Sequence, residues 1–188
     1  MEQPIKKELM MKRYHPLLVS LHWLLAILIL FSLLTGSNIL AELGNDDPEK
    51  IAILKVHMIV GLVIFSLMLL RLIVRIKTKK PKEIDTGNTI INKAGKYTHY
   101  IFYVLVFLIV ASGLGVAILT GLPDIVFFES GAALPETFND LLPRKAHGFL
   151  TKALFFLIVL HLLAVLYHQF VRKDGLLSRM WFGKQKEL

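Results

Sequence analysis

The chain has no cysteine and far fewer charged residues than a water-soluble protein of its length. Among its 188 residues there is no Cys, and only 19% are Asp, Glu, Lys or Arg, against about 25% in an average soluble domain. The absence of cysteine excludes a disulfide scaffold, an iron–sulfur cluster, haem attached through a CxxCH motif and a thiol nucleophile. Apolar residues reach 55%, which excludes a disordered chain. A membrane protein remains, provided that the apolar residues form long runs.

Four long apolar runs meet that condition. They cover about residues 17–39, 51–74, 100–122 and 146–171, and each is close to or above the roughly 20 residues that cross a hydrocarbon core of about 30 Å. Each is expected to be a helix, because an isolated strand leaves its backbone unpaired in lipid. The first run is too long for a signal peptide and has no small-x-small cleavage site after it. The sequence therefore predicts an all-α membrane protein, with residues 1–188 forming one four-helix domain and translation starting at Met1 or Met11.

Basic residues are concentrated on one side of the predicted membrane. Of 22 Lys and Arg residues, four precede the first run, eight lie at the end of the second run and in the loop after it, and five follow the fourth. The positive-inside rule assigns that side to the cytoplasm, so both termini are expected to face inward. The formal net charge of +8 then reflects topology and contact with anionic lipid rather than binding to nucleic acid.

Histidines are the most informative residues of the chain. Of seven in total, four lie well inside the apolar runs: His22, His57, His147 and His161. Ionisable side chains within membrane spans are rare and mark functional sites by default, although a single one can also serve as an interhelical hydrogen-bonding residue. His99 lies at the start of the third run, and His15 and His168 lie at the cytoplasmic edges.

The depths of the four intramembrane histidines arrange them in two layers. A helical rise of 1.5 Å per residue places His22 roughly 9 Å and His161 roughly 8 Å from the cytoplasmic face, with His57 and His147 near the outer ends of their helices. His147 and His161 are 14 residues apart, so they share one helix face at a separation of about 21 Å. Two haems stacked in one bundle, each iron held by two imidazoles from facing helices, require this arrangement.

Other kinds of site fit this pattern less well. Zinc needs ligands clustered around one ion, whereas these histidines form two distant pairs. A histidine proton relay would need acidic partners inside the runs, which contain none. The chain also has no phosphate-binding loop, nucleophile elbow or paired carboxylates for hydrolysis.

Other residues on the same helix faces support haem binding. Gly61, one turn after the histidine of the second run, leaves room for a flat macrocycle near the backbone. Arg71 lies level with the inner histidine pair and Arg75 one turn beyond it, where guanidinium groups can bind haem propionates. Both arginines can equally be basic anchors that extend to lipid headgroups, and this alternative stays open. Gly113 and Gly115 predict close helix packing.

Several segments together resemble the bacterial cytochrome b561 family. They are SLHW at 20–23, HMIVG at 57–61, RLIVR at 71–75, KAHGFL at 145–150 and VLHLLAVLYH at 159–168. The resemblance covers roughly residues 12–181. It implies an inner-membrane four-helix protein with two haems b, related to the cytochrome b subunits of Ni,Fe-hydrogenases. By position, the implied axial ligands are the four intramembrane histidines. The segment THYIFY, with His99 and Tyr103, matches a family segment without an iron-ligand role.

The resemblance also implies an activity, since the best-understood relatives oxidise superoxide at the periplasmic face and reduce ubiquinone toward the cytoplasm. His168 lies seven residues after His161 on the same helix face. At the cytoplasmic end it can donate a hydrogen bond or a proton to a quinone carbonyl near pH 7, with His15 as a second candidate. The alternative is that His168 only anchors the helix at the interface.

The outer side carries a local concentration of cations in spite of its acidic balance. Its five basic and eight acidic residues give a net charge of −3, which argues against attraction of superoxide. However, Lys55, Arg144, Lys145 and Lys152 all lie within five residues of an outer histidine, and the carboxylates lie farther away. These cations predict a positive region that draws an anion to the outer haem, unless they only balance propionates or cap helices.

Three classes of function are consistent with the sequence. The first is an enzyme that moves electrons from superoxide to ubiquinone. The second is an electron-transfer subunit that docks a dehydrogenase or hydrogenase as its protein partner. The third is a haemless structural or transport protein, which would show no visible absorption. The outer loop, from about 122 to 145, is short, which favours the first class without excluding the second.

Overall fold

The computed structural model describes residues 13–81, 85–128 and 130–182, and all regular structure within these ranges is helical. Four helices are long and apolar enough to cross a membrane, which confirms the predicted all-α, four-helix architecture. Both candidate start residues lie outside the described residues, as do six of the basic residues counted for orientation: Lys6, Lys7, Lys12, Lys82, Lys184 and Lys186.

The described residues form five α-helices and three short helical turns of other kinds. The α-helices are α1 (Pro16–Thr35), α2 (Pro48–Lys77), α3 (Thr89–Thr120), α4 (Leu122–Phe127) and α5 (Leu142–Leu166). π-Helical turns extend α1 over Gly36–Leu40 and α5 over Tyr167–Arg172, and a 3₁₀ helix covers Leu177–Met180. Proline occupies the first turn of α1, α2 and α5, where its missing N–H costs no helical hydrogen bond.

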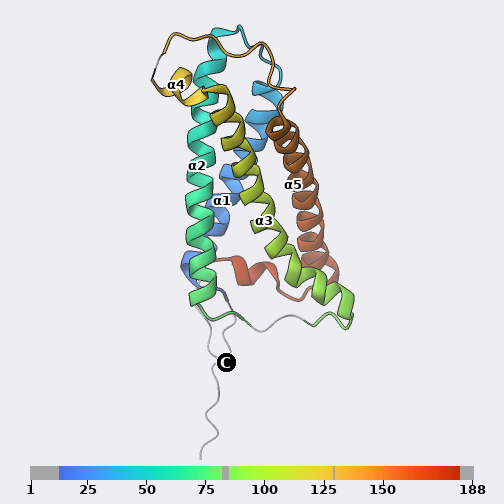
Figure 1. Cartoon of the computed structure of the whole chain (residues 1–188). Coiled ribbons are helices and arrows are strands. Elements are labelled where there is room, and N and C mark those ends of the chain that lie inside the picture. Colours follow the sequence, from blue (N-terminus) through green and yellow to red (C-terminus); the bar gives the residue numbers. More distant parts are fainter. Residues whose placement is uncertain (1–12, 82–84, 129, 183–188) are drawn as a thin grey trace, which may run out of the picture.

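The four long helices alternate in direction and associate as two pairs. Close packing joins α1 to α2 and α3 to α5, and the two pairs face each other across the middle of the bundle (Figure 1). Both ends of the described chain lie at one end of the bundle, called here the termini end. The short helix α4 lies at the opposite end, called here the α4 end (Figure 1).

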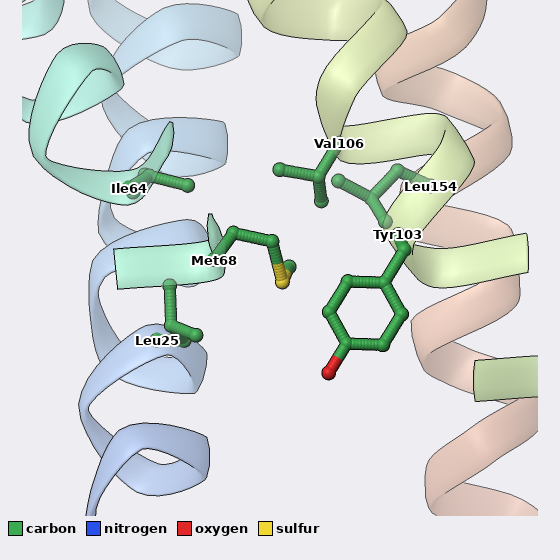
Figure 2. Close-up of a cluster of buried hydrophobic side chains, with 6 residues drawn as sticks. All are labelled: Leu25, Ile64, Met68, Tyr103, Val106 and Leu154. Carbon is green, nitrogen blue, oxygen red and sulfur yellow. The ribbon is translucent and has the colours of Figure 1, made fainter. Parts of the chain in front are cut away.

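A buried apolar layer connects the two helix pairs midway along the bundle. It consists of six side chains from all four long helices: Leu25, Ile64, Met68, Tyr103, Val106 and Leu154. In Figure 2, Met68 and Tyr103 point toward each other from opposite sides of the interior. Most other large apolar side chains are exposed, as expected for a surface that is covered by lipid. A second cluster packs α4 against the end of α3.

The long helices begin before their apolar runs do, and the difference is largest for α3 and α5. α3 starts at Thr89 rather than near Tyr100, because the Asn88 side chain accepts hydrogen bonds from the backbone of Ile90 and Ile91 and caps the helix in a polar stretch. α5 likewise starts at Leu142 rather than near residue 146. Hydropathy indicates where lipid begins, whereas the start of α3 is decided by the Asn88 cap. The short helix α4 lies within the segment from about 122 to 145 that the sequence predicts to be a loop.

The C-terminal segment, residues 173–182, crosses the termini end of the bundle between α5 and α1 (Figure 1). Trp23 of α1 donates a hydrogen bond from Nε1 to the carbonyl of Met180 at 2.8 Å. The rings of Trp23 and Trp181 also meet edge to face at 5.6 Å. The Tyr14 amide donates to the carbonyl of Arg179 at 3.2 Å. These contacts hold the segment against the start of α1.

The substitution Trp23→Phe tests this attachment, because it keeps an aromatic ring and removes the donor to Met180. Loss of one hydrogen bond worth about 1 kcal/mol should speed amide hydrogen exchange in residues 180–182 about fivefold. The matched control is Ser20→Ala, which removes a hydroxyl bonded only to Pro16 within the same helix and should leave that exchange unchanged. Equal exchange in both variants would contradict the role of Trp23.

Candidate functional site

The structure brings the four intramembrane histidines together in the two pairs expected from their depths. At the α4 end, the rings of His57 on α2 and His147 on α5 have centroids 6.2 Å apart. Toward the termini end, His22 on α1 and His161 on α5 have ring centroids 6.4 Å apart. In each pair the two ring planes differ by 71°. Each pair joins one helix of the α1–α2 pair to α5.

The spacing within each pair fits two imidazoles on opposite sides of one metal. Imidazole–metal bonds are about 2.0–2.1 Å long, so two nitrogens in line are about 4 Å apart, and adding about 1 Å to each ring centre gives about 6 Å. Among the described residues there is no group of three or more His, Cys, Asp or Glu that could hold a metal ion. Pairs without further donors suit the axial positions of haem iron, because the porphyrin supplies the other four ligands.

Hydrogen bonds orient the two histidines of the outer pair. His147 Nδ1 lies 3.0 Å from the carbonyl oxygen of Ile109 and 3.2 Å from Ser112 Oγ. Because a carbonyl only accepts, Nδ1 of His147 carries the hydrogen, and the lone pair of the neutral ring is on Nε2. His57 Nδ1 lies 3.5 Å from Ser32 Oγ. Metal-binding histidines are held in this way through the nitrogen that does not bind the metal.

Two glycines allow helices to approach the outer histidine rings. A Cβ added to Gly36 would lie 3.4 Å from Cε1 of His57, and one added to Gly113 would lie 3.3 Å from Cε1 of His147. The sequence analysis assigned Gly113 to helix packing and did not single out its contact with the ring. Gly115 does pack against another helix, since its added Cβ would lie 3.1 Å from Pro143. These contacts could have been predicted from the sequence, because the small residues Gly36 and Gly113 occur at the depth of the outer histidines.

Gly61 differs from these glycines. A Cβ added there would meet no other atom within 4 Å, so the helix backbone at this position is not covered by a neighbouring side chain. Gly61 lies one turn after the histidine of α2 in the outer pair. This open backbone fits the predicted approach of a flat group.

Two arginines of α2 lie near the inner pair. Arg71 is only 7% exposed, which does not fit a side chain extended to lipid headgroups. Its Nη1 donates to the hydroxyl of Tyr103 at 3.4 Å, and its guanidinium lies 5.9 Å from the centre of that ring. Nε of Arg71 and Nε of Arg75 are buried without a hydrogen-bond partner among the described residues. Buried cations of this kind need an anionic partner.

The protein itself supplies no such anion within the described ranges. There, the ion pairs all involve one carboxylate, Asp174, which binds His168 and Arg172. The propionates of a haem are planar carboxylates that match guanidinium donors. The donors present therefore fit haem both at the iron and at the porphyrin edge.

His99 joins the inner group from α3. Its ring centroid lies 6.4 Å from that of His161, and Phe102 contacts the same ring at 5.6 Å. The inner end of the interior therefore holds three imidazoles and two guanidinium groups. The assignment of His99 to the haem surroundings stays a prediction.

The structure distributes the outer cations unequally. Arg144 is half-buried, passes over Gly148, and is close enough to interact electrostatically with both outer histidines. Lys55 Nζ lies 5.9 Å from the ring centre of Phe127 at the end of α4. Lys145 and Lys152 are exposed. Arg144 is thus the cation that the fold brings nearest to the outer pair.

Lys50 is a buried cation at the α4 end that the sequence pattern did not single out as a site residue. This lysine is 7% exposed, donates to the carbonyl of Leu43 and interacts electrostatically with Arg144. It lies two helical turns before the histidine of α2, so helical spacing could have identified it. Two cations, one of them buried, therefore lie at the α4 end beside the outer pair.

The two histidines considered for quinone have different surroundings. His15 is exposed and caps α1 by accepting a hydrogen bond from the Leu17 amide at 3.2 Å. His168 is half-buried in the π-helical turn after α5, and its Nδ1 lies 2.6 Å from a carboxylate oxygen of Asp174. The contacts of the described residues do not join these two histidines.

Comparisons with known proteins agree with this geometry. The family model described as "Prokaryotic cytochrome b561" matches residues 13–183. "Probable superoxide oxidase CybB" of Yersinia pestis is 28% identical over 178 residues, which cover 91% of this chain and 97% of the relative. "Cytochrome b561 homolog 2" of Escherichia coli (strain K12) is 24% identical over 172 residues, covering 90% and 91% respectively.

The family match covers all four long helices and both histidine pairs. The family is one of membrane cytochromes that bind b-type haem and transfer electrons, which agrees with the apolar helices and the paired imidazoles. The chain therefore belongs to the prokaryotic cytochrome b561 family.

Proposed function

We propose that this protein oxidises superoxide at the α4 end and reduces ubiquinone at the termini end, with electrons crossing the membrane through two haems b. The observation that carries this proposal is the pair of histidine sites. The ring centroids lie 6.4 and 6.2 Å apart, so the two imidazoles of each pair would be able to hold one haem, and the sites are separated by 14 residues along α5.

In this proposal, His57 and His147 hold the outer haem, and His22 and His161 hold the inner haem. Arg71 and Arg75, with His99 beside them, bind the propionates of the inner haem, and Gly61 gives the outer haem access to the backbone of α2. When bound, haem iron supplies a one-electron carrier whose potential depends on axial ligands, hydrogen bonds and burial. The apolar layer shown in Figure 2 keeps water out of the space between the two sites.

The donor is assigned to superoxide on two grounds. A relative aligned over nearly the full chain carries the name superoxide oxidase, and Arg144, Lys50 and Lys55 place positive charge near the outer pair. Positive charge at a site raises the rate at which an anion reaches it. Two superoxide ions each give up one electron and leave as oxygen, and one quinone takes both electrons and two protons. The termini end is assigned to the cytoplasm because it holds most of the basic residues.

The substitution His161→Ala tests the two-haem assignment. It removes one ligand of the inner pair, so the purified protein should retain one haem, the outer one, where the intact protein has two. Pyridine haemochrome quantification and a reduced-minus-oxidised spectrum measure this change. The corresponding variant of the partner, His22→Ala, should lose the same haem. An intact protein with one haem or none would refute the assignment.

The substitution Gly113→Ala should weaken the outer site selectively. Its added methyl group lies 3.3 Å from the His147 ring and displaces that ligand, so we expect a lower outer-haem content with the inner haem retained. Gly115→Ala is the matched control, because its methyl group meets Pro143 instead. The control should reduce stability without a preference between haems. Equal haem loss in both variants would argue against a special role of Gly113.

The superoxide assignment is tested by stopped-flow reduction of haem after a pulse of superoxide. Arg144→Gln and Lys55→Gln should each slow the reduction, with Arg144→Gln the larger effect and Lys145→Gln a smaller one. Added salt should slow the wild type too, because charges are screened over about 8–10 Å near physiological ionic strength. Lys93→Gln, on the opposite side of the predicted membrane, is the control.

Rates that respond neither to these substitutions nor to salt would remove the support for superoxide. In that case the docking of a dehydrogenase or hydrogenase would become the better candidate, and a copurifying redox partner should then be sought.

A further inference from the structure

A histidine and a carboxylate form a close couple at the termini end of the bundle. His168 Nδ1 lies 2.6 Å from Oδ2 of Asp174, and the two side chains are only 14% and 17% exposed. The couple follows the inner histidine of α5 by two helical turns. It is separate from the residues assigned to either haem.

The chain turns sharply to bring these two residues together. α5 ends in the π-helical turn Tyr167–Arg172, after which Lys173 adopts a left-handed conformation with φ 54°. A non-glycine residue in this conformation is strained and persists only where the surrounding structure holds it. Gly175 follows with φ 72°. As a result, Asp174 folds back onto the last turn of the helix.

Three donors hold the Asp174 carboxylate in place. Oδ2 accepts from His168 and, at 3.1 Å, from Nε of Arg172, and Oδ1 accepts from the Leu176 amide at 3.3 Å. Partial burial alone would raise the pKa of Asp174, but these hydrogen bonds outweigh it and the pKa is lowered. The carboxylate is therefore ionised at neutral pH and can only accept hydrogen bonds.

This ionisation determines the state of His168. Because the carboxylate only accepts, Nδ1 of His168 carries a hydrogen, and Nε2 on the other side of the ring is the nitrogen that exchanges a proton. A carboxylate behind an imidazole holds its tautomer and stabilises the imidazolium form, as in a catalytic triad.

We propose that Asp174 is a positioning residue that aims Nε2 of His168 at the reducible quinone and keeps that nitrogen supplied with protons. The inference rests on the proposed function, which places ubiquinone reduction at this end. Reduction of one quinone needs two electrons, which come from the inner haem, and two protons, which come from the cytoplasm. Nε2–H of His168 gives a proton to a quinone carbonyl oxygen, and water restores it while Asp174 retains the hydrogen on Nδ1.

If Asp174 only fixed the C-terminal segment to the end of α5, its contact with His168 would not be needed. Arg172 already binds Asp174, and it also donates to the backbone carbonyls of Thr86 and Asp85 in the loop between α2 and α3. The groups facing the couple are Arg172 and Tyr167, whose ring lies edge-on against His168 at 6.0 Å. The fully exposed Asp85 interacts with Arg172 and not with the couple itself.

The experiment uses the haem-loaded protein in detergent with ubiquinone-1 as the probe. Reoxidation of reduced haem is followed by stopped flow from about pH 5 to 8, the range in which histidine titrates. For Asp174→Asn, the rate at saturating quinone should fall at least about tenfold, with an unchanged half-saturating concentration. The dependence of this rate on pH should also change, because the amide no longer holds the hydrogen on Nδ1 as the carboxylate does. Haem content and spectrum should stay those of the wild type.

Asp85→Asn is the matched control, because it removes a carboxylate from the same end that is bonded to Gly87 and Asn92 of its own loop. Its rates and pH profile should equal those of the wild type. Asp174→Glu, which keeps the charge, should restore most of the rate and the wild-type pH profile.

The outcomes separate this inference from the function on which it rests. If His168→Ala slows quinone reduction and Asp174→Asn behaves like Asp85→Asn, the role of Asp174 is overturned and the quinone assignment stands. If His168→Ala also leaves the rate unchanged, both are overturned. Loss of haem in Asp174→Asn, with an unaltered pH profile and no rescue by Asp174→Glu, would show a structural role only.

Discussion

The organisation of this bundle depends on the free-energy cost of burying imidazole and guanidinium groups that have no carboxylate partner among the described residues. Four imidazoles and the guanidinium of Arg71 lie in an apolar interior, and no carboxylate of the described residues meets them. Isolated buried charge is strongly unfavourable. These groups therefore need a partner that binds the imidazole nitrogens through their lone pairs and carries negative charge opposite the guanidinium. Under the proposed assignment a haem would do both, since its iron would take the imidazole nitrogens and its propionates would take the guanidinium groups. The spacing of helices, the placement of small residues and the apolar layer between the sites all follow from that requirement.

The sequence predicted the parts of the structure that follow from repeating geometry. Hydropathy identified the four helices, and a rise of 1.5 Å per residue was enough to pair His22 with His161 and His57 with His147. It did not predict features set by single hydrogen bonds or by chain reversals. The early start of α3 comes from the side chain of Asn88, and the approach of Asp174 to His168 comes from one left-handed residue. Such contacts depend on local backbone angles, which leave no periodic trace in a sequence.

The two sites are supported to different degrees by the protein. In the outer pair, His147 is held by a backbone carbonyl and a serine, and both rings are bordered by glycine. In the inner pair, the rings are surrounded by other aromatic and cationic groups. Burial and hydrogen bonding of the axial ligands are among the properties that set haem potentials. The fold therefore gives the two histidine pairs different surroundings, which under the proposed function would give the two haems different potentials.

The division of the bundle into two helix pairs has a consequence for how the protein is made. α1 packs on α2 and α3 on α5, yet the outer and the inner histidine pair each join a helix of the α1–α2 pair to α5. A ribosome completes α5 last among the long helices, so neither pair of ligands exists while the first three helices are entering the membrane. If these pairs hold haem as proposed, haem insertion would be a late step in biogenesis and would join the two helix pairs.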